Sequence, residues 1–157
     1  MLLKEQTEFS AKLPQEARIL GLDVGETTIG IAISDLRRVI ATPLLTIERK
    51  KFSQDMGKLK EIIEKHSIAG LVIGLPLNMD GSNSRRTQST KTFASNLCKQ
   101  IDLPMVFWDE RMSTQAVEKI MLSADMSRQR RAELVDKLAA SYILQGFLDA
   151  RGYEPRA

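Results

Sequence analysis

Short apolar runs alternate along the chain with longer amphipathic stretches, and this pattern predicts the order of the strands and helices. The runs typical of strands fall at residues 18–24, 29–34, 38–41, 69–76 and 104–108. The first three are joined by short turns, so we expect an antiparallel meander, with a further extended piece at 42–49. The last two are almost wholly apolar, which is typical of strands covered on both faces.

Apolar residues at helical spacing predict four helices, at residues 53–66, 84–101, 113–122 and 132–151. Ser53 or Asp55 is the expected cap of the first helix and Ser113 that of the third. Helices that alternate with buried strands indicate an α/β fold, namely a mixed five-stranded sheet with helices on both faces. The strands at 69–76 and 104–108 should then be parallel.

We expect one domain, because 157 residues are enough for one core and too few for two ordinary ones. Residues 1–17 are expected to be a loosely attached polar extension, 18–150 the domain and 151–157 a tail. No apolar run approaches the roughly 18 residues of a membrane span, so we expect no membrane partner and a cytoplasmic location. The only cysteine is Cys98 and the only histidine is His66. A disulfide within the chain, a cysteine-rich zinc site and a histidine-rich metal site are thereby excluded.

Positive charge gathers in one third of the chain. Residues 85–131 contain nine Lys or Arg and five Asp or Glu, whereas the whole chain carries a net charge of only +3. A local basic excess suits a polyanionic partner such as nucleic acid, and a solvated surface is the alternative.

Acidic residues interrupt or follow two of the apolar runs. Asp23 stands near the end of the run at 18–24, and Asp109 and Glu110 come directly after the run at 104–108. Because the carboxyl ends of neighbouring parallel strands meet at one edge of a sheet, we expect these acids to lie close together.

The closing helix supplies a third acid. In a projection at about 100° per residue, Asp136 falls within the apolar arc of this helix, whereas Lys137, Ser141 and Gln145 mark the expected solvent side. We therefore expect the helix to turn Asp136 toward the body of the protein.

Carboxylates that converge in this way repel one another unless a cation lies between them. Hard oxygen ligands favour Mg²⁺ or Mn²⁺ over zinc. Two such ions about 4 Å apart can activate a water molecule and stabilise the leaving oxygen in phosphodiester cleavage. The three acids therefore indicate a metal-dependent nuclease.

Each acid also has a structural alternative. Asp23 could accept hydrogen bonds from backbone amides in the turn that follows it. Asp109 or Glu110 could form a surface ion pair with Arg111. Asp136 could favour the N-terminus of its own helix.

Two further segments carry groups that suit a phosphate. Residues 81–84, Gly-Ser-Asn-Ser, offer amides and hydroxyls just before a helix, with ordinary helix capping as the alternative. The arginines at 128, 130 and 131 could hold substrate or form a solvated turn.

Four segments, LGLDVGETTIGIAISD, LVIGLPLNMDGS, VFWDERMST and LVDKLAASYIL, occur in this order along the chain. Together they resemble the YqgF/RuvX family over about residues 18–150. Members of that family are described as Holliday-junction resolvases or pre-16S rRNA nucleases with a ribonuclease H-like fold. The resemblance implies this fold here.

The resemblance also implies that Asp23, Glu110 and Asp136 are the catalytic and metal-binding acids, with Glu110 preferred to Asp109. The residues that we assign with it to the substrate side are Gly25, Gly74, Pro76, Gly81, Ser82, Arg111, Ser113 and Thr114. The family usually has a basic pair shortly after its first aspartate, where this chain has two threonines, at 27 and 28. That departure weakens any phosphate contact from this turn.

We therefore expect a nuclease that uses Mg²⁺ or Mn²⁺ to process the 5′ end of pre-16S rRNA, as a monomer or homodimer. Branched DNA is the alternative substrate, and its symmetric resolution would require a dimer with two sites. A non-catalytic nucleic-acid-binding protein is a second alternative. A sugar- or acetate-kinase-like ATPase is the third, because DVGETTIG also resembles a phosphate loop of that superfamily, although those proteins need two such lobes.

Overall fold

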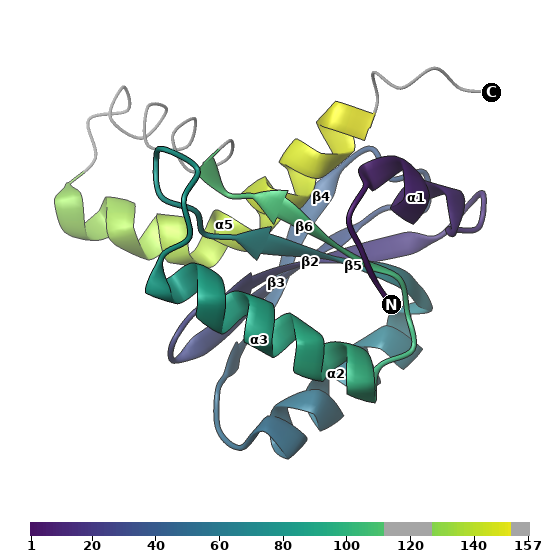
Figure 1. Cartoon of the computed structure of the whole chain (residues 1–157), viewed down its shortest axis with the longest axis horizontal. Coiled ribbons are helices and arrows are strands. Elements are labelled where there is room, and N and C mark those ends of the chain that lie inside the picture. Colours follow the sequence, from purple (N-terminus) through teal and green to yellow (C-terminus); the bar gives the residue numbers. More distant parts are fainter. Residues whose placement is uncertain (112–126, 152–157) are drawn as a thin grey trace.

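A six-stranded mixed sheet, ordered β1-β6-β5-β2-β3-β4, forms the centre of the computed structural model (Figure 1). The structure describes residues 1–111 and 127–151, without the side chains of 128–137 and 151. The strands are β1 (Leu2–Leu3), β2 (Arg18–Val24), β3 (Thr28–Ser34), β4 (Ala41–Glu48), β5 (Ile68–Leu75) and β6 (Met105–Asp109). The helices are α1 (Gln6–Ala11), α2 (Phe52–His66), α3 (Arg85–Gln100) and α5 (Arg128–Arg151). No helix in these ranges is long and apolar enough to cross a membrane.

The directions of the strands agree with the expected pattern. β2, β3 and β4 form the antiparallel meander, and β5 is parallel to both β2 and β6. The third strand of the meander begins at Ala41 and runs to Glu48, so the run at 38–41 precedes it instead of forming it. The reason lies in the hairpin before it, where the Asp35 side chain accepts hydrogen bonds from the amides of Val39 and Ile40.

The N-terminal segment is attached more firmly than its polar composition indicates. β1 adds a sixth, parallel strand beside β6, so the expected number of five strands was wrong. On α1, Phe9 is fully buried and packs edge-to-face on Phe147 of α5, with ring centroids 5.5 Å apart. One aromatic residue therefore anchors a segment whose other residues are mostly exposed.

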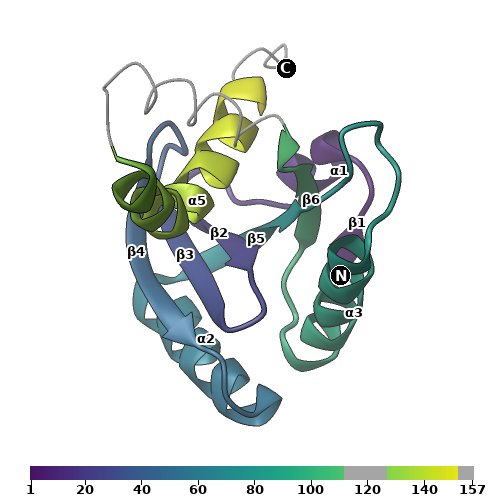
Figure 2. The same cartoon turned by 90° about the vertical axis from the view of Figure 1, so that its left-hand side faces the viewer.

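Helices cover both faces of the sheet, as Figures 1 and 2 show. One apolar core lies between the sheet and the pair α2 and α3, and the other between the sheet and the pair α5 and α1. Alternation along β2 produces this division, because Leu20 and Leu22 enter the first core and Ile19 the second. The expected layers are therefore present.

Gly21 lets α5 approach the sheet closely. A Cβ atom at this position would lie 2.7 Å from Leu144 Cβ and 3.0 Å from the Ala140 carbonyl oxygen. Since one of these atoms belongs to the helix backbone, Gly21→Ala should force α5 away from β2 and destabilise the protein by about 1–3 kcal/mol. Thermal or urea unfolding measures the change.

Gly57 in α2 provides the matched control. A Cβ atom at this position would meet nothing within 4 Å, and the residue is exposed. Gly57→Ala should therefore raise the free energy of unfolding by about 0.5–1 kcal/mol, because alanine is the better helix former. If both variants changed stability equally, the close contact between α5 and β2 would not be the cause.

Candidate active site

The candidate site lies at the carboxyl-end edge of the parallel strands, on the face that α5 covers. Asp23 follows Ile19 and Gly21 at alternate positions of β2, so it lies on their side of the sheet. Gly74 of β5 lies on the same side, because a Cβ atom there would be 2.5 Å from Ile143 Cδ1 of α5. The first half of α5 lies on the side of the molecule toward which β5 and β6 point (Figure 1).

Glu110 joins Asp23 at this edge. The Glu110 amide donates to the Leu75 carbonyl oxygen at 3.2 Å, which holds the residue at the end of β5. Its side chain crosses Gly74, where a Cβ atom would lie only 2.6 Å from Glu110 Oε1. The absence of a side chain at Gly74 therefore leaves the space in which Glu110 meets Asp23.

The two carboxyl groups act on each other. The pKa of Glu110 is raised to about 8, first by burial, then by the charge of Asp23 and by a hydrogen bond with the Asp23 side chain. The positive charge of Arg86 opposes this increase, and the negative charge of Asp109 adds to it. Near neutral pH the pair therefore shares a proton in the absence of a cation, as expected for two carboxylates in one desolvated place.

Asp109 has a different environment from its neighbour Glu110. The Arg111 guanidinium contacts both of its carboxylate oxygens, with Nη2 2.5 Å from Oδ2, and the Arg111 amide donates to Oδ1 at 3.0 Å. These hydrogen bonds lower the pKa of Asp109. The ion pair considered from the sequence is thus formed by Asp109, and Glu110 is the acid beside Asp23.

The third predicted acid, Asp136, lies in α5, but its side chain is outside the described residues. At about 100° per residue, position 136 falls between Ile143 and Phe147 around the helix. Both of these residues are buried, Ile143 beside Gly74 of β5 and Phe147 against Trp108 of β6. Within the described part of the chain, no group of three acidic, histidine or cysteine side chains could hold a metal ion. The described donors are thus the pair Asp23 and Glu110.

The solvent side expected for α5 was partly wrong. Ser141 is only 8% exposed, and its hydroxyl donates to the Leu138 carbonyl oxygen at 2.7 Å. Gln145 is half-buried and joins α5 to the hairpin before β4 by accepting from the Ala41 amide and donating to the Val39 carbonyl. Leu144 and Leu148 are also buried, so the buried arc of α5 extends toward Ser141 and Gln145. The helix therefore turns a different face to the sheet from the one that the sequence predicted.

The loop between β5 and α3 is organised by its own polar groups. Arg111 Nη1 donates to the Met79 carbonyl oxygen at 3.0 Å and lies close to Gly81, whose φ of +88° suits glycine. The Ser82 hydroxyl donates to Asp80 at 2.6 Å. Arg111 therefore fixes this loop to the end of β6.

The start of α3 corresponds to the capping alternative. Ser84 and Thr87 form a reciprocal capping box, and both hydroxyls also donate to the buried Pro76 carbonyl oxygen. Pro76 is thus an acceptor for the cap. Ser113 and Thr114 lie outside the described residues.

Sequence reasoning did not assign Arg86 or Arg49. Arg86 is near enough to act on Glu110 through its charge, although 24 residues separate them. Arg49 follows β4, and its amide donates to the Thr27 carbonyl oxygen at 2.8 Å in the turn between β2 and β3. Only the pairing of β3 with β4 could have placed Arg49 there.

Comparison with known sequences confirms the resemblance. Residues 17–150 match the family described as "RuvX: Holliday junction resolvase". A Rhodobacter capsulatus protein named "Putative pre-16S rRNA nuclease" is 54% identical over 157 residues, covering 100% of this chain and 99% of that protein. A Ruegeria protein of the same name is 57% identical over 142 residues, or 90% of each chain.

Comparison with solved structures confirms the fold. Thermus thermophilus RuvC in complex with a Holliday junction superposes with a TM-score of 0.52 over 87% of this chain and 96% of that chain, at 13% identity. At this identity the likeness concerns the fold alone, which is ribonuclease H-like as expected.

Proposed function

The chain belongs to the RuvX family, and from this premise and the geometry of its acidic pair we propose that it is a metal-dependent nuclease that hydrolyses phosphodiester bonds of structured nucleic acid. The observation that carries the proposal is the contact between Asp23 and Glu110, with the pKa of Glu110 raised to about 8. Perturbed carboxyl groups at the carboxyl-end edge of such a sheet are typical of a reactive site.

The donor set fits a hard divalent cation. Both groups are carboxyl groups, and without a cation a proton lies between them. A bound divalent cation would displace this proton and neutralise the two negative charges. Asp23 and Glu110 would hold Mg²⁺ or Mn²⁺, with Asp136 as the third proposed ligand. The metal, as one ion or as a pair, would supply Lewis-acid stabilisation of the charge that develops on the phosphate.

The chain's own residues would orient the substrate. Arg86 adds positive charge beside the acidic pair and would attract the phosphate that is cut. Arg111 holds the loop of Gly81 and Ser82 in place and would act on substrate by positioning this loop. Gly25 would allow a close approach of the backbone, whereas Gly74 would act through Glu110, whose side chain occupies the space above it. Ser113 and Thr114 remain proposed contacts from the sequence.

We favour the 5′ end of pre-16S rRNA as the substrate, because relatives more than half identical to this chain carry the name of that activity. Four-way DNA junctions are the second candidate, which the description of the family favours. Incubation of the protein with both substrates, with and without Mn²⁺, tests the proposal. Metal-dependent cleavage of precursor rRNA is the expected result. Thermal stabilisation by ATP without any cleavage would instead favour the kinase-like alternative.

Gly74→Ala provides a test of the geometry itself. The new methyl group would displace the flexible ends of Glu110 and Ile143, so the fold should persist while Glu110 moves away from Asp23. We expect the rate of cleavage to fall by about 10–100-fold, since a displacement of about 1 Å in a reactive group can cost this much. Single-turnover cleavage measures the loss, and a wild-type rate would contradict the proposed position of Glu110.

A further inference from the structure

A groove with a volume of about 740 Å³ lies beside the candidate site, on the face of the sheet that carries α2 and α3. Its walls are the turn between β2 and β3, the segment that joins β4 to α2, and one face of α3. The groove begins at Val24 and Gly25, which directly follow Asp23. A ligand that lay in it would therefore extend away from the acidic pair.

The charge of the groove is strongly positive. Arg49 and Lys50 line it from the end of β4, and Arg85 and Arg86 line it from the first turn of α3. Among the described lining residues, Glu26 is the one carboxylate that opposes these four cations. The remaining polar side chains along α3 are uncharged hydrogen-bonding groups. Such a lining is suited to a polyanion.

Arg49 is held in position before any ligand binds. Its guanidinium stands over the Phe93 ring, 5.3 Å from the centroid, and Nη1 donates to the Gly25 carbonyl oxygen at 2.5 Å. The Lys50 amide donates at 3.1 Å to Asp55, whose side chain is only 2% exposed. These contacts fix the segment that carries both cations, so less conformational entropy is lost when a ligand binds.

The groove offers little for reading bases. Phe93 is 5% exposed, and it packs edge-to-face against Phe52 beneath Arg49. The Phe93 ring is therefore covered, by the protein and by Arg49, and offers no open face on which a base could stack. Contacts from arginine and lysine to phosphates carry no sequence information.

We propose that this groove binds the sugar-phosphate backbone of one nucleic-acid strand, next to the position at which the strand is cut. The inference rests on the proposed function only for the cleavage position. Arg49 and Lys50 supply positive charge to a turn whose own residues 26–28 contain no lysine or arginine.

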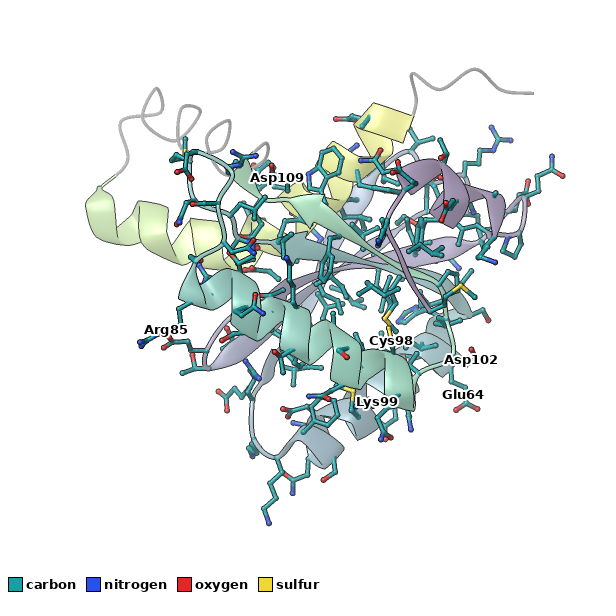
Figure 3. All side chains as sticks on the ribbon, viewed as in Figure 1. Glu64, Arg85, Cys98, Lys99, Asp102 and Asp109 are labelled. Carbon is teal, nitrogen blue, oxygen red and sulfur yellow. The ribbon has the colours of Figure 1, made fainter. Side chains whose placement is uncertain are left out.

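Binding of a labelled single-stranded RNA of arbitrary sequence, measured in EDTA so that it stays intact, tests the groove separately from cleavage. Lys50→Glu/Arg85→Glu should weaken binding about tenfold or more at low salt. It should also reduce the slope of log K against log salt by about 1–2, between about 50 and 200 mM salt. Lys60→Glu/Lys99→Glu is the matched control, because both lysines are exposed and outside the groove. Lys99 lies at the end of α3 opposite Arg85 (Figure 3).

The proposal is wrong if Lys50→Glu/Arg85→Glu binds RNA like the wild type, or if this variant and Lys60→Glu/Lys99→Glu lose affinity equally. Should charge reversal disturb the fold, Lys50→Gln/Arg85→Gln repeats the test, with a slope change of about 1–2 expected again because the same two phosphate contacts are lost. Cleavage by the same proteins separates the two proposals. A wild-type protein that never cuts, but whose binding depends on the groove, would contradict the nuclease and support the groove.

Discussion

Asp23→Asn and Glu110→Gln should each reduce metal-dependent cleavage by a factor on the order of 10³ or more, while the protein remains folded. Each change removes one carboxylate of the pair that would hold the cation. This factor corresponds to a loss of about 4 kcal/mol in stabilisation of the transition state by the cation, because each 1.36 kcal/mol is worth about tenfold in rate. Single-turnover cleavage of precursor rRNA in Mn²⁺ measures the effect, and circular dichroism checks the fold.

Asp109→Asn is the matched control for these variants. Asp109 is adjacent to Glu110 in sequence, but its carboxylate is paired with Arg111. Loss of the Asp109 charge should loosen the loop that Arg111 holds, and the rate of cleavage should fall about tenfold or less. If Asp109→Asn were as inactive as Glu110→Gln, or if Asp23→Asn cut normally, the assignment of the pair would be wrong.

Glu110→Gln should also stabilise the metal-free protein at pH 8, by up to about 4 kcal/mol at about 1.36 kcal/mol per unit of pKa. The pKa of Glu110 is raised from 4.5 to about 8 by burial, by the charge of Asp23 and by their hydrogen bond, with Arg86 opposing and Asp109 adding. Between these two pH values the folded state binds more protons than the unfolded state. The stability of the wild type therefore falls as the pH rises from about 4.5 to about 8.

Urea unfolding in EDTA at both ends of this pH range measures the difference. The advantage of Glu110→Gln should be small at the acidic end and largest near pH 8, and Mg²⁺ should remove it by stabilising only the wild type. Glu64→Gln, at an exposed position of α2 (Figure 3), controls for the loss of a carboxylate from the surface. An advantage for Glu110→Gln that did not change with pH would contradict the raised pKa of Glu110.

Periodicity was sufficient to predict the order of the described strands and helices from β2 onward, because both faces of the sheet are covered and the buried side of each element is apolar in sequence. It failed where a single residue decides the outcome. Phe9 anchors a segment that composition described as polar, and Leu144 and Leu148 rotate the buried arc of α5 beyond the expected one. The hairpin before β4 depends on hydrogen bonds to Asp35, which no hydrophobic pattern reveals.

The acidic pair could be anticipated for a physical reason. A carboxylate within a buried strand is costly, and parallel strands end at one edge, so Asp23 and the acids at the end of β6 were expected near each other. The expectation took the two strands as neighbours, whereas β5 lies between them and Glu110 reaches Asp23 across Gly74 of β5. Residue spacing could not separate Asp109 from Glu110, because the choice depends on Arg111 and on the empty space at Gly74. The basic groove was missed because it joins residues 25, 49 and 85, which only the tertiary structure brings together.

Anomalous X-ray scattering from crystals soaked in Mn²⁺ would locate the cation that the acidic pair is proposed to bind. We expect a manganese peak within coordination distance of the carboxylates of Asp23 and Glu110, with Asp136 completing the ligands. Crystals that took up manganese elsewhere while the two carboxylates stayed in contact with each other would contradict this expectation.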